Sequence, residues 1–435
     1  MERLVGVVDV SSDKTATALA AQVDELAASF GITADKLVAQ TYDGAAVMCG
    51  DKHGVQRLVK QRFPKAGFIH CRAHVLNLVL LHSCANNRKT TRFFNTISSL
   101  ASFFSQSPKR NSKLQEFMES KLPSVCKTKW SYNSRMIRIV ELNYAAISAC
   151  LVDIYMGEND FDGDSCATAR GLHGFLLEFN TILLLKIFVE IFSHTDVLYQ
   201  VLQSNELDIV ECVKHVKQCQ ASIENLIDEE RFSSILNEAI TLSGGENVDI
   251  PACRHLYETI IEKVSLEMSK RFDGLQEYEY LGLLNQEKFE YFHTSFPTRL
   301  VKMLVSQHNF DEAKLSNELK VLYSRNEFRD SSVGQIMSLI AKKNLEQAFS
   351  ETFKLAKLTL TIPSTTASVE RSFSVLRRVK NYLRSTMGQS RLFALMLMAV
   401  EGELLKEISE NPKFYDDVID MFAAKNERRL NLNYK

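Results

Sequence analysis

Two short segments near opposite ends of the chain constrain its fold more than any other feature. Residues 41–48 read TYDGAAVM, and residues 363–374 read PSTTASVERSFS. Asp43 follows an apolar run and precedes small residues, which is typical of a strand end. Glu370 lies early in an amphipathic pattern after a Ser/Thr-rich entry, which predicts the first turn of a helix. Two carboxylates brought together from such positions can hold divalent metal for phosphoryl transfer.

The apolar patterns elsewhere predict a small number of strands followed by a long helical region. Strands are predicted at residues 3–10, directly before Asp43, and at residues 67–71. Helices are predicted at residues 14–30, 55–63 and 73–84, and almost everything from residue 93 onward has a helical pattern. Strands connected by helical crossovers indicate an α/β core, so we predict an α+β, mostly α chain.

Further motifs give the chain a family resemblance. The first segment continues through GVQ at residues 54–56 to HCRAHVLNL at residues 70–78. Together with the Glu370 segment, these motifs resemble transposases of the hAT superfamily and host proteins derived from them. The resemblance is close at residues 1–84 and 356–403 and loose between them. It implies an RNase H-like core split by a large all-α insertion, with a C-terminal dimerisation region. The corresponding domains are residues 1–92, 93–349 and 350–435.

The resemblance also implies a metal site of three acids, of which this sequence matches two. Asp43 matches the second acid and Glu370 the third, and their oxygens are expected within about 4–8 Å of each other. Asp9 lies in the wrong segment for the first acid, and Asp13 has the position of a helix-start residue. We therefore expect a decayed, domesticated or N-terminally truncated relative with a vestigial site. No cofactor is expected if the site is inactive. If the acidic site is completed, Mg²⁺ or Mn²⁺ is the expected cofactor.

The Cys71-x-x-His74 motif has three interpretations that the sequence leaves open. It resembles half of a zinc site, but a structural zinc site usually has two well-spaced ligand pairs. It also fits a packed helix start. In the family this motif lies close to the active site and assists strand transfer, which makes Cys71 and His74 candidate DNA-binding residues. The resemblance further implies that Trp130, after Lys129, stacks on a flipped base, and the alternative is a core tryptophan.

Charge is unevenly distributed along a chain whose net charge is −1. Residues 88–138 carry eleven Lys or Arg and only two acids. A second basic stretch contains Arg371, Arg377, Arg378, Lys380, Arg384 and Arg391. Such patches bind phosphate backbones or simply form solvated helix faces. The nine cysteines have no repeating spacing, and with no signal peptide they favour a reducing compartment.

Apolar residues after Glu370 predict self-association. Helical spacing places Leu376 and Leu383 on one face, and Leu392, Leu395 and Met396 on another. The function predicted from all these features is a nuclear hAT-transposase-derived protein that forms a homodimer, with DNA as a further candidate partner and without competent catalysis. Two alternatives stay open: a fragment of an active cut-and-paste DNA transposase, and a purely structural interaction module. No membrane association or small-molecule substrate is predicted.

Overall fold

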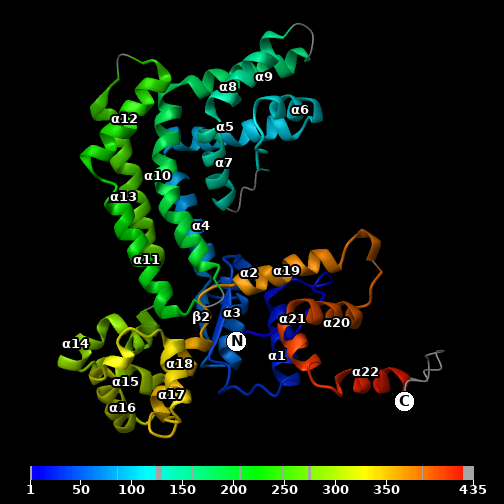
Figure 1. The fold of residues 1–435 in the computed structure, drawn as a ribbon, viewed down its shortest axis with the longest axis vertical. Coiled ribbons are helices and arrows are strands. Elements are labelled where there is room, and N and C mark those ends of the chain that lie inside the picture. Colours follow the sequence, from blue (N-terminus) through cyan, green and yellow to red (C-terminus); the bar gives the residue numbers. More distant parts are fainter. Residues whose placement is uncertain are drawn as a thin grey trace. The chain divides into compact units, whose positions relative to one another are not determined.

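The structure of the chain is a computed structural model that describes residues 2–85, 87–123, 130–157, 161–204, 207–245, 248–272, 276–384 and 386–424 (Figure 1). It forms two units, each described by itself. The terminal unit comprises Met1–Leu37, Ala46–Pro64 and Thr366–Lys435, and the central unit comprises Val38–Ala45 and Lys65–Thr365. The described residues are mostly helical with one small sheet, which confirms the predicted fold class. The three-domain division stays a prediction.

The sheet of the central unit consists of two parallel strands, β1 (Ala39–Tyr42) and β2 (Gly67–His70). Their register pairs Ala39 with Gly67 and Tyr42 with His70. Both strands lie where the apolar patterns predicted them, so these two predictions are confirmed. Cys71 extends the ladder because its N–H donates to the Tyr42 carbonyl at 3.0 Å.

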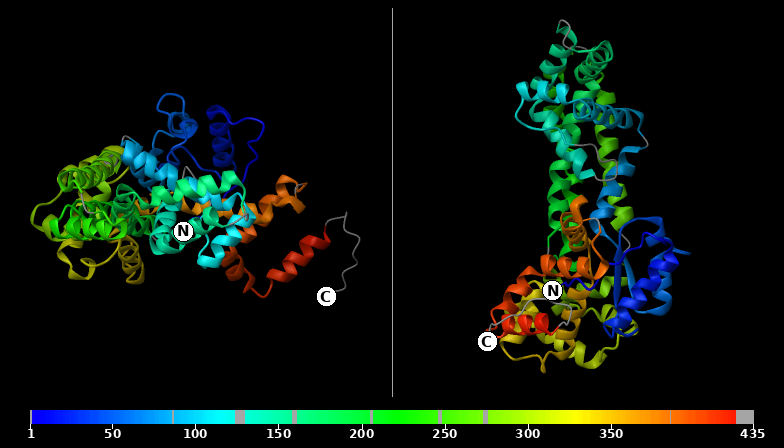
Figure 2. Two further views of the ribbon diagram at one scale, coloured as in Figure 1. Left: turned by 90° about the horizontal axis from the view of Figure 1, so that it is seen from above. Right: turned by 90° about the vertical axis from the view of Figure 1, so that its right-hand side faces the viewer.

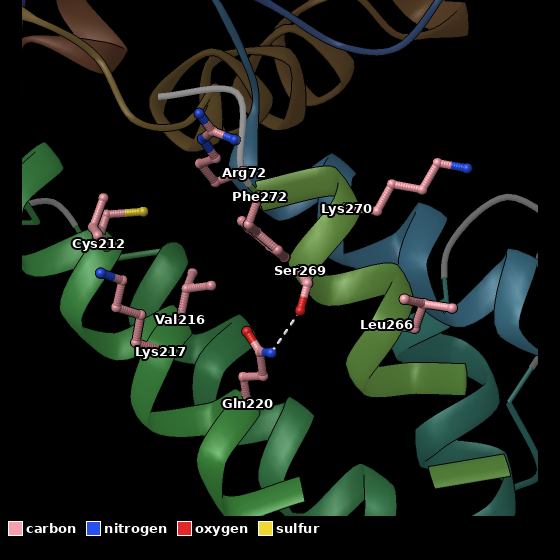
Figure 3. Close-up of a pocket in the computed structure, with 10 residues that line it drawn as sticks. Arg72, Cys212, Val216, Lys217, Gln220, Leu266, Ser269, Lys270 and Phe272 are labelled. Carbon is pink, nitrogen blue, oxygen red and sulfur yellow. Dashed lines mark hydrogen bonds between the residues drawn. The ribbon is translucent and has the colours of Figure 1, made fainter. Parts of the chain in front are cut away.

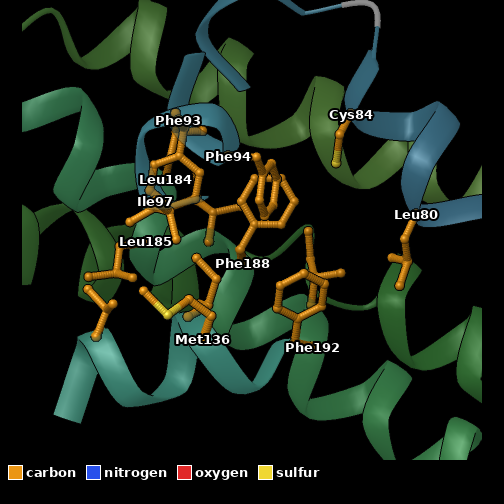
Figure 4. Packing of buried hydrophobic residues seen from close by; sticks show 14 of the residues in the cluster. Leu80, Cys84, Phe93, Phe94, Ile97, Met136, Leu184, Leu185, Phe188 and Phe192 are labelled. Atoms are coloured by element: carbon orange, nitrogen blue, oxygen red, sulfur yellow. The ribbon is translucent and has the colours of Figure 1, made fainter. Parts of the chain in front are cut away.

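Ten helices of the central unit surround a first hydrophobic core: α4 (Arg72–Ala85), α5 (Arg88–Ser105), α6 (Pro108–Phe117), α7 (Trp130–Leu142), α8 (Tyr144–Met156), α9 (Gly163–Leu177), α10 (Phe179–Leu202), α11 (Ile209–Glu224), α12 (Glu229–Ser243) and α13 (Ile250–Phe272). Helix α10 packs against α7, α11 and α12, and two views show the long helices of this unit side by side (Figure 2). Phe94 packs edge-on against Phe188 with ring centroids 4.7 Å apart (Figure 4).

A second core of the central unit forms among shorter helices: η1 (Gln276–Leu284), η2 (Gln286–Lys288), α14 (Phe289–Thr294), α15 (Thr298–Gln307), α16 (Glu312–Ser324), η3 (Asn326–Phe328), α17 (Val333–Lys342) and α18 (Ser350–Thr361). Tyr323 is fully buried there and donates its hydroxyl to the Leu283 carbonyl at 2.9 Å. Side-chain caps define several helix starts, because they bind backbone N–H groups that have no partner within the helix. Asp311 caps α16, and Ser332 with Gln335 forms a capping box at α17.

The terminal unit contains α1 (Ala16–Ser29), α2 (Ala46–Cys49), α3 (Val55–Arg62), α19 (Ala367–Val379), η4 (Tyr382–Arg384), α20 (Gln389–Val400), α21 (Gly402–Ser409) and α22 (Phe414–Ala423). Helix α1 packs against α3, and α19 packs against α20. Thr15 caps α1 by accepting from the Ala18 N–H at 3.3 Å. Segments from both ends of the sequence therefore build this one unit.

The strand predicted at residues 3–10 is wrong, because this segment has no regular secondary structure. A strand requires backbone partners on a neighbouring strand. Here the Glu401 carboxylate takes the Leu4 N–H at 2.7 Å and pairs with Arg3 at 2.6 Å. A side chain at the end of α20 thus replaces the ladder that the apolar pattern predicted.

Candidate functional site

Asp43 lies directly after β1, at the carboxyl end of the parallel sheet. Its side chain is exposed, and Oδ1 accepts from the Ala45 N–H at 3.1 Å. His70 ends β2 and is paired with Tyr42 in the register, so the residues after both strands emerge at the same sheet edge. The strand pairing therefore positions a carboxylate and an imidazole at one edge, as predicted for Asp43 from the apolar run before it.

A glycine allows two imidazoles to approach this edge. His70 and His74 stack with ring centroids 5.5 Å apart and an interplanar angle of 26°. A Cβ atom added to Gly44 would lie 2.5 Å from His74 Nε2 and 3.1 Å from His70 Nε2. Any other residue at this position would displace at least one ring. The group formed by Asp43, Gly44, His70 and His74 is called the sheet-edge cluster.

His70 is the residue of this cluster that sequence reasoning did not select as a site residue. It is half-buried, and among the described residues its buried Nε2 finds no hydrogen-bond partner. Burial lowers the pKa of His70 to about 4, His74 and Arg72 add to the lowering, and Asp43 opposes it. His70 is therefore neutral at pH 7. The sequence could have indicated His70 as a site residue, because it directly precedes the Cys71-x-x-His74 motif.

Cys71 and His74 are placed differently, although they lie three residues apart. The Cys71 side chain is fully buried and belongs to the first core, whereas His74 is partly exposed beside Gly44. The burial of Cys71 is consistent with a packed helix start, one of the three interpretations left open by the sequence, and its predicted role in DNA binding stays a prediction. DNA contact by His74 stays a prediction.

The three-acid pattern implies a site for Mg²⁺ or Mn²⁺, so the side chains near Asp43 should be of the kind that bind these ions. Mg²⁺ prefers oxygen ligands, whereas imidazole suits softer transition metals. In the central unit, Gly44 next to Asp43 faces His70 and His74, and Asp43 acts electrostatically on His70. Across the parts of the chain that are described, no group of three or more His, Cys, Asp or Glu could hold a metal ion. The cluster within this unit does not fit a magnesium site.

The start of the segment at residues 363–374, which contains Glu370, forms hydrogen bonds with β1 and with the start of α4. The Thr41 hydroxyl donates to the Pro363 carbonyl at 3.0 Å, and the Arg72 N–H donates to the Ser364 carbonyl at 3.1 Å. Glu370 follows in the first turn of α19 and is partly exposed, but it belongs to the terminal unit. The predicted approach of Glu370 to Asp43 therefore stays a prediction.

The candidate DNA-binding residues near position 130 lie largely outside the residues that the structure describes. Lys129 lies outside the described residues, and Trp130 begins α7 with a side chain that is also outside them. Base stacking by Trp130 stays a prediction.

Many cations between residues 88 and 138 have partners inside the protein. Arg92 pairs with Glu178 at 2.6 Å, and Lys113 pairs with Asp153 at 2.7 Å. Other cations lie over aromatic rings, including Lys109 over Phe161 and Arg110 over Phe103. The charge of this stretch thus serves internal contacts to a considerable extent, which favours the structural interpretation of this run over DNA binding.

The C-terminal basic stretch differs from this first run. Its members on α19, directly after α19, on η4 and on α20 are all exposed: Arg371, Arg377, Arg378, Lys380, Arg384 and Arg391. Within the described part of the chain, Arg377, Arg378, Arg384 and Arg391 form no ion pair with a carboxylate. These arginines are therefore accessible to phosphate groups from outside.

The residues predicted for dimerisation fall into two groups, one buried inside the chain and one at least partly exposed. Leu392 and Met396 are 3% and 1% exposed, so they pack inside the chain. Leu376 and Leu395 are partly exposed, and Leu383 is 76% exposed. Further apolar side chains of the same segments are exposed without having been selected from the sequence: Val369, Phe373, Leu397 and Met398. We call Val369, Phe373, Leu383, Leu397 and Met398 the exposed apolar set.

The low pKa of His70 predicts a pH dependence of stability. Because the folded-state value of about 4 lies below the ordinary value of about 6.5, the unfolded chain binds more protons between these pH values. The free energy of unfolding should therefore fall as pH is lowered through this window, by roughly 1–2 kcal/mol after allowance for solvent screening. Urea unfolding at pH 7.0, 5.5 and 4.5 measures this, and His70→Gln should remove this part of the dependence.

The exposed His53 provides the matched control. His53→Gln should keep the wild-type pH dependence. Equal pH dependence in wild type and His70→Gln would contradict the assignment of the effect to the sheet-edge cluster.

Comparison with known families gives two matches. Residues 317–404 match the hAT family C-terminal dimerisation region. Residues 1–54 match the ZMYM1/FAM200, RNase-like domain, and this match includes Asp43. The first match contains α19 and α20, together with the whole exposed apolar set. In the described residues no single helix combines the length and apolar character of a membrane span, and one bent pair, Tyr132–Leu142 with Tyr144–Met156, does so by length and composition only.

Proposed function

Because this chain is a hAT transposase-like protein, we propose that it is a nuclear, transposable-element-derived protein that self-associates through its C-terminal region and binds DNA. In this proposal the 435 residues do not cleave DNA on their own. Self-association is the primary biochemical property, and DNA binding depends on the arginines presented by the same unit.

The observation that carries the proposal is the coincidence of the matched dimerisation region with exposed apolar residues. Phe373 is 62% exposed and Val369 is 51% exposed, one helical turn apart on α19. A contiguous apolar patch on a surface is typical of a protein interface. A second copy of the chain would remove these side chains from water, which supports self-association through this region.

DNA binding is supported by the charge around the same helices. Arg377 and Arg378 lie in the last turn of α19, and Arg391 lies near the start of α20. The last turn of a helix favours cations even without a ligand, so Arg377 and Arg378 also stabilise α19. Arg391 has no such role, because the first turn of a helix favours acids. Dimerisation would place two such groups of arginines on one assembly, which increases the avidity for a continuous duplex.

The absence of cleavage is supported by the ligands present at the sheet edge. Of the three acids that the transposase site requires, the sequence matches Asp43 and Glu370 only. Within the central unit, the side chains that face Gly44 next to Asp43 are imidazoles, and these do not suit Mg²⁺. We therefore expect no divalent-dependent nicking of DNA by these 435 residues.

Fluorescence anisotropy with a 30-base-pair duplex tests the DNA-binding proposal. We expect saturable binding whose affinity falls at least tenfold in Arg378→Glu/Arg391→Glu at about 100 mM salt, because charge reversal prevents these side chains from binding phosphates. The slope of log affinity against log salt should fall by about 1.8, since each neutralised phosphate accounts for about 0.9. Lys302→Glu/Lys342→Glu changes the charge equally on exposed sites of the central unit and should bind like wild type.

Two results of the same assay would overturn the proposal. Equal affinity of wild type and Arg378→Glu/Arg391→Glu, or no binding by a wild-type dimer, would leave a structural interaction module. Cleavage of the duplex with Mg²⁺ or Mn²⁺ that disappears in Asp43→Ala would instead indicate an active transposase.

A further inference from the structure

A pocket of about 560 Å³ lies in the central unit between the start of α4, α11 and α13 (Figure 3). Its size is within the range of sites for small organic ligands. Apolar side chains form much of its wall, and polar and cationic groups complete it: Arg72, Cys212, Val213, Val216, Lys217, Gln220, Leu266, Ser269, Lys270 and Phe272. The pocket belongs to neither the sheet-edge cluster nor the exposed apolar set.

Arg72 is the unusual residue of this pocket, because it is a buried cation. It is 3% exposed, and its guanidinium carbon lies 5.9 Å from the centre of the Phe272 ring. Its Nε is buried without a hydrogen-bond partner among the described residues. No carboxylate in the described part of the chain forms an ion pair with it, and the groups that favour its charge are Cys212, Cys71 and Tyr278.

A buried guanidinium without a carboxylate is costly, since burying an unpaired ion costs several kcal/mol even after relaxation. Burial lowers the pKa of Arg72, yet arginine stays protonated in proteins because its ordinary value is so high. The adjacent thiol does not supply a counter-charge, because burial raises the pKa of Cys212 to about 12. An anion inside the pocket would provide the missing partner.

The mouth of the pocket adds further positive charge. Lys217 on α11 and Lys270 on α13 are both exposed members of the lining, and the Lys270 side chain is directed away from Arg72, which lies buried beside Phe272 (Figure 3). Nearby carboxylates already have partners. Glu224 accepts from Gln220 at 3.0 Å, and Glu267 pairs with Arg271 at 2.7 Å. Three cations thus belong to the lining, and among the described residues this lining contains no acid.

We propose that this pocket binds a small organic phosphate of mononucleotide size. A guanidinium presents paired N–H donors that match phosphate oxygens, and the three cations suit a dianion better than a monoanionic carboxylate. The walls formed by Val213, Val216 and Leu266 accept an apolar body, and the Phe272 ring accepts a flat one. Inorganic phosphate alone would leave this apolar wall in contact with water, so it should bind more weakly.

Isothermal titration calorimetry of the full chain with adenosine monophosphate tests this proposal, with adenosine and inorganic phosphate as matched probes. We expect a Kd below about 1 mM for adenosine monophosphate. Adenosine, which lacks the phosphate, and inorganic phosphate, which lacks the nucleoside, should each bind at least tenfold more weakly. Arg72→Gln should weaken binding at least tenfold. Because Arg72 is buried, Lys217→Glu/Lys270→Glu provides a second variant at exposed positions, with an expected loss of at least threefold at low salt.

The control is Lys302→Glu/Lys342→Glu, which changes exposed lysines away from the pocket and should bind adenosine monophosphate like wild type. Failure of the wild-type chain to bind adenosine monophosphate at 10 mM, or equal binding by Arg72→Gln and wild type, would overturn the proposal. Arg72-dependent binding of a single-stranded oligonucleotide without binding of adenosine monophosphate would also overturn it, since the phosphate source would then be a nucleic acid. These outcomes do not depend on dimerisation or on duplex binding.

Discussion

Met396→Ala is expected to lower the free energy of unfolding of the terminal unit by about 2–5 kcal/mol. Met396 is 1% exposed on α20, so its truncation removes buried apolar surface and leaves a cavity. The effect should be large because few other large apolar side chains of this unit are fully buried, among them Val55, Val59 and Leu392. Hydrogen exchange of the α20 amides in urea measures the change in this unit separately from the central unit.

Met421→Ala is the matched control, since Met421 lies on α22 of the same unit, outside the matched dimerisation region, and is 73% exposed. Its truncation should change the free energy of unfolding by less than about 0.5 kcal/mol. Equal effects of the two substitutions would show that Met396 does not pack inside the unit as described.

Phe373→Asp is expected to convert the proposed dimer into monomer at tens of micromolar protein. The ring is 62% exposed on α19 inside the matched dimerisation region, so a second copy would bury it. Replacing it with a carboxylate removes apolar contact at about 25 cal/mol per Å² and places a charge at the interface. If Phe373 is one of the few residues that dominate the interface, its loss costs about 2 kcal/mol or more, or about thirtyfold in dissociation constant. Sedimentation velocity measures the change, and circular dichroism should show retained helix.

Phe30→Asp changes a similarly exposed phenylalanine, 56% exposed after α1 and outside the dimerisation match, and should leave the dimer intact. A wild-type chain that sediments as monomer at the same concentration would contradict the proposed self-association. A dimer that survives Phe373→Asp would place the interface elsewhere on the chain.

The strands of the sheet could be predicted from their local sequence, whereas the segment at residues 3–10 could not. The apolar run before Asp43 and the run ending at His70 predicted two strands, and both strands are present. Side-chain alternation and turn residues act within a few positions, so they can be recognised without knowledge of the rest of the chain. The segment at residues 3–10 has an equally apolar pattern but lacks a strand partner, and Glu401 binds its backbone instead. Strand pairing depends on residues remote in sequence, which apolarity alone cannot reveal.

Charge in the sequence was equally ambiguous until the tertiary contacts were known. The run at residues 88–138 and the arginines after Glu370 have similar composition, yet Arg92 and Lys113 of the first run pair with acids far along the chain. Arg377 and Arg391 of the second stretch are exposed. The sequence records how many charges a segment has, whereas folding decides which of them are neutralised.

The sequence by itself determined the family resemblance, the mostly helical class, and the strand that presents Asp43, because motif order and local periodicity carry that information. Only the tertiary structure decided that Leu392 and Met396 pack inside the chain while Phe373 and Met398 remain exposed. It also decided that Arg72, located between Cys71 and His74, borders a pocket formed by α11 and α13. Both outcomes depend on which surfaces meet, and helical periodicity identifies an apolar face without identifying what covers it.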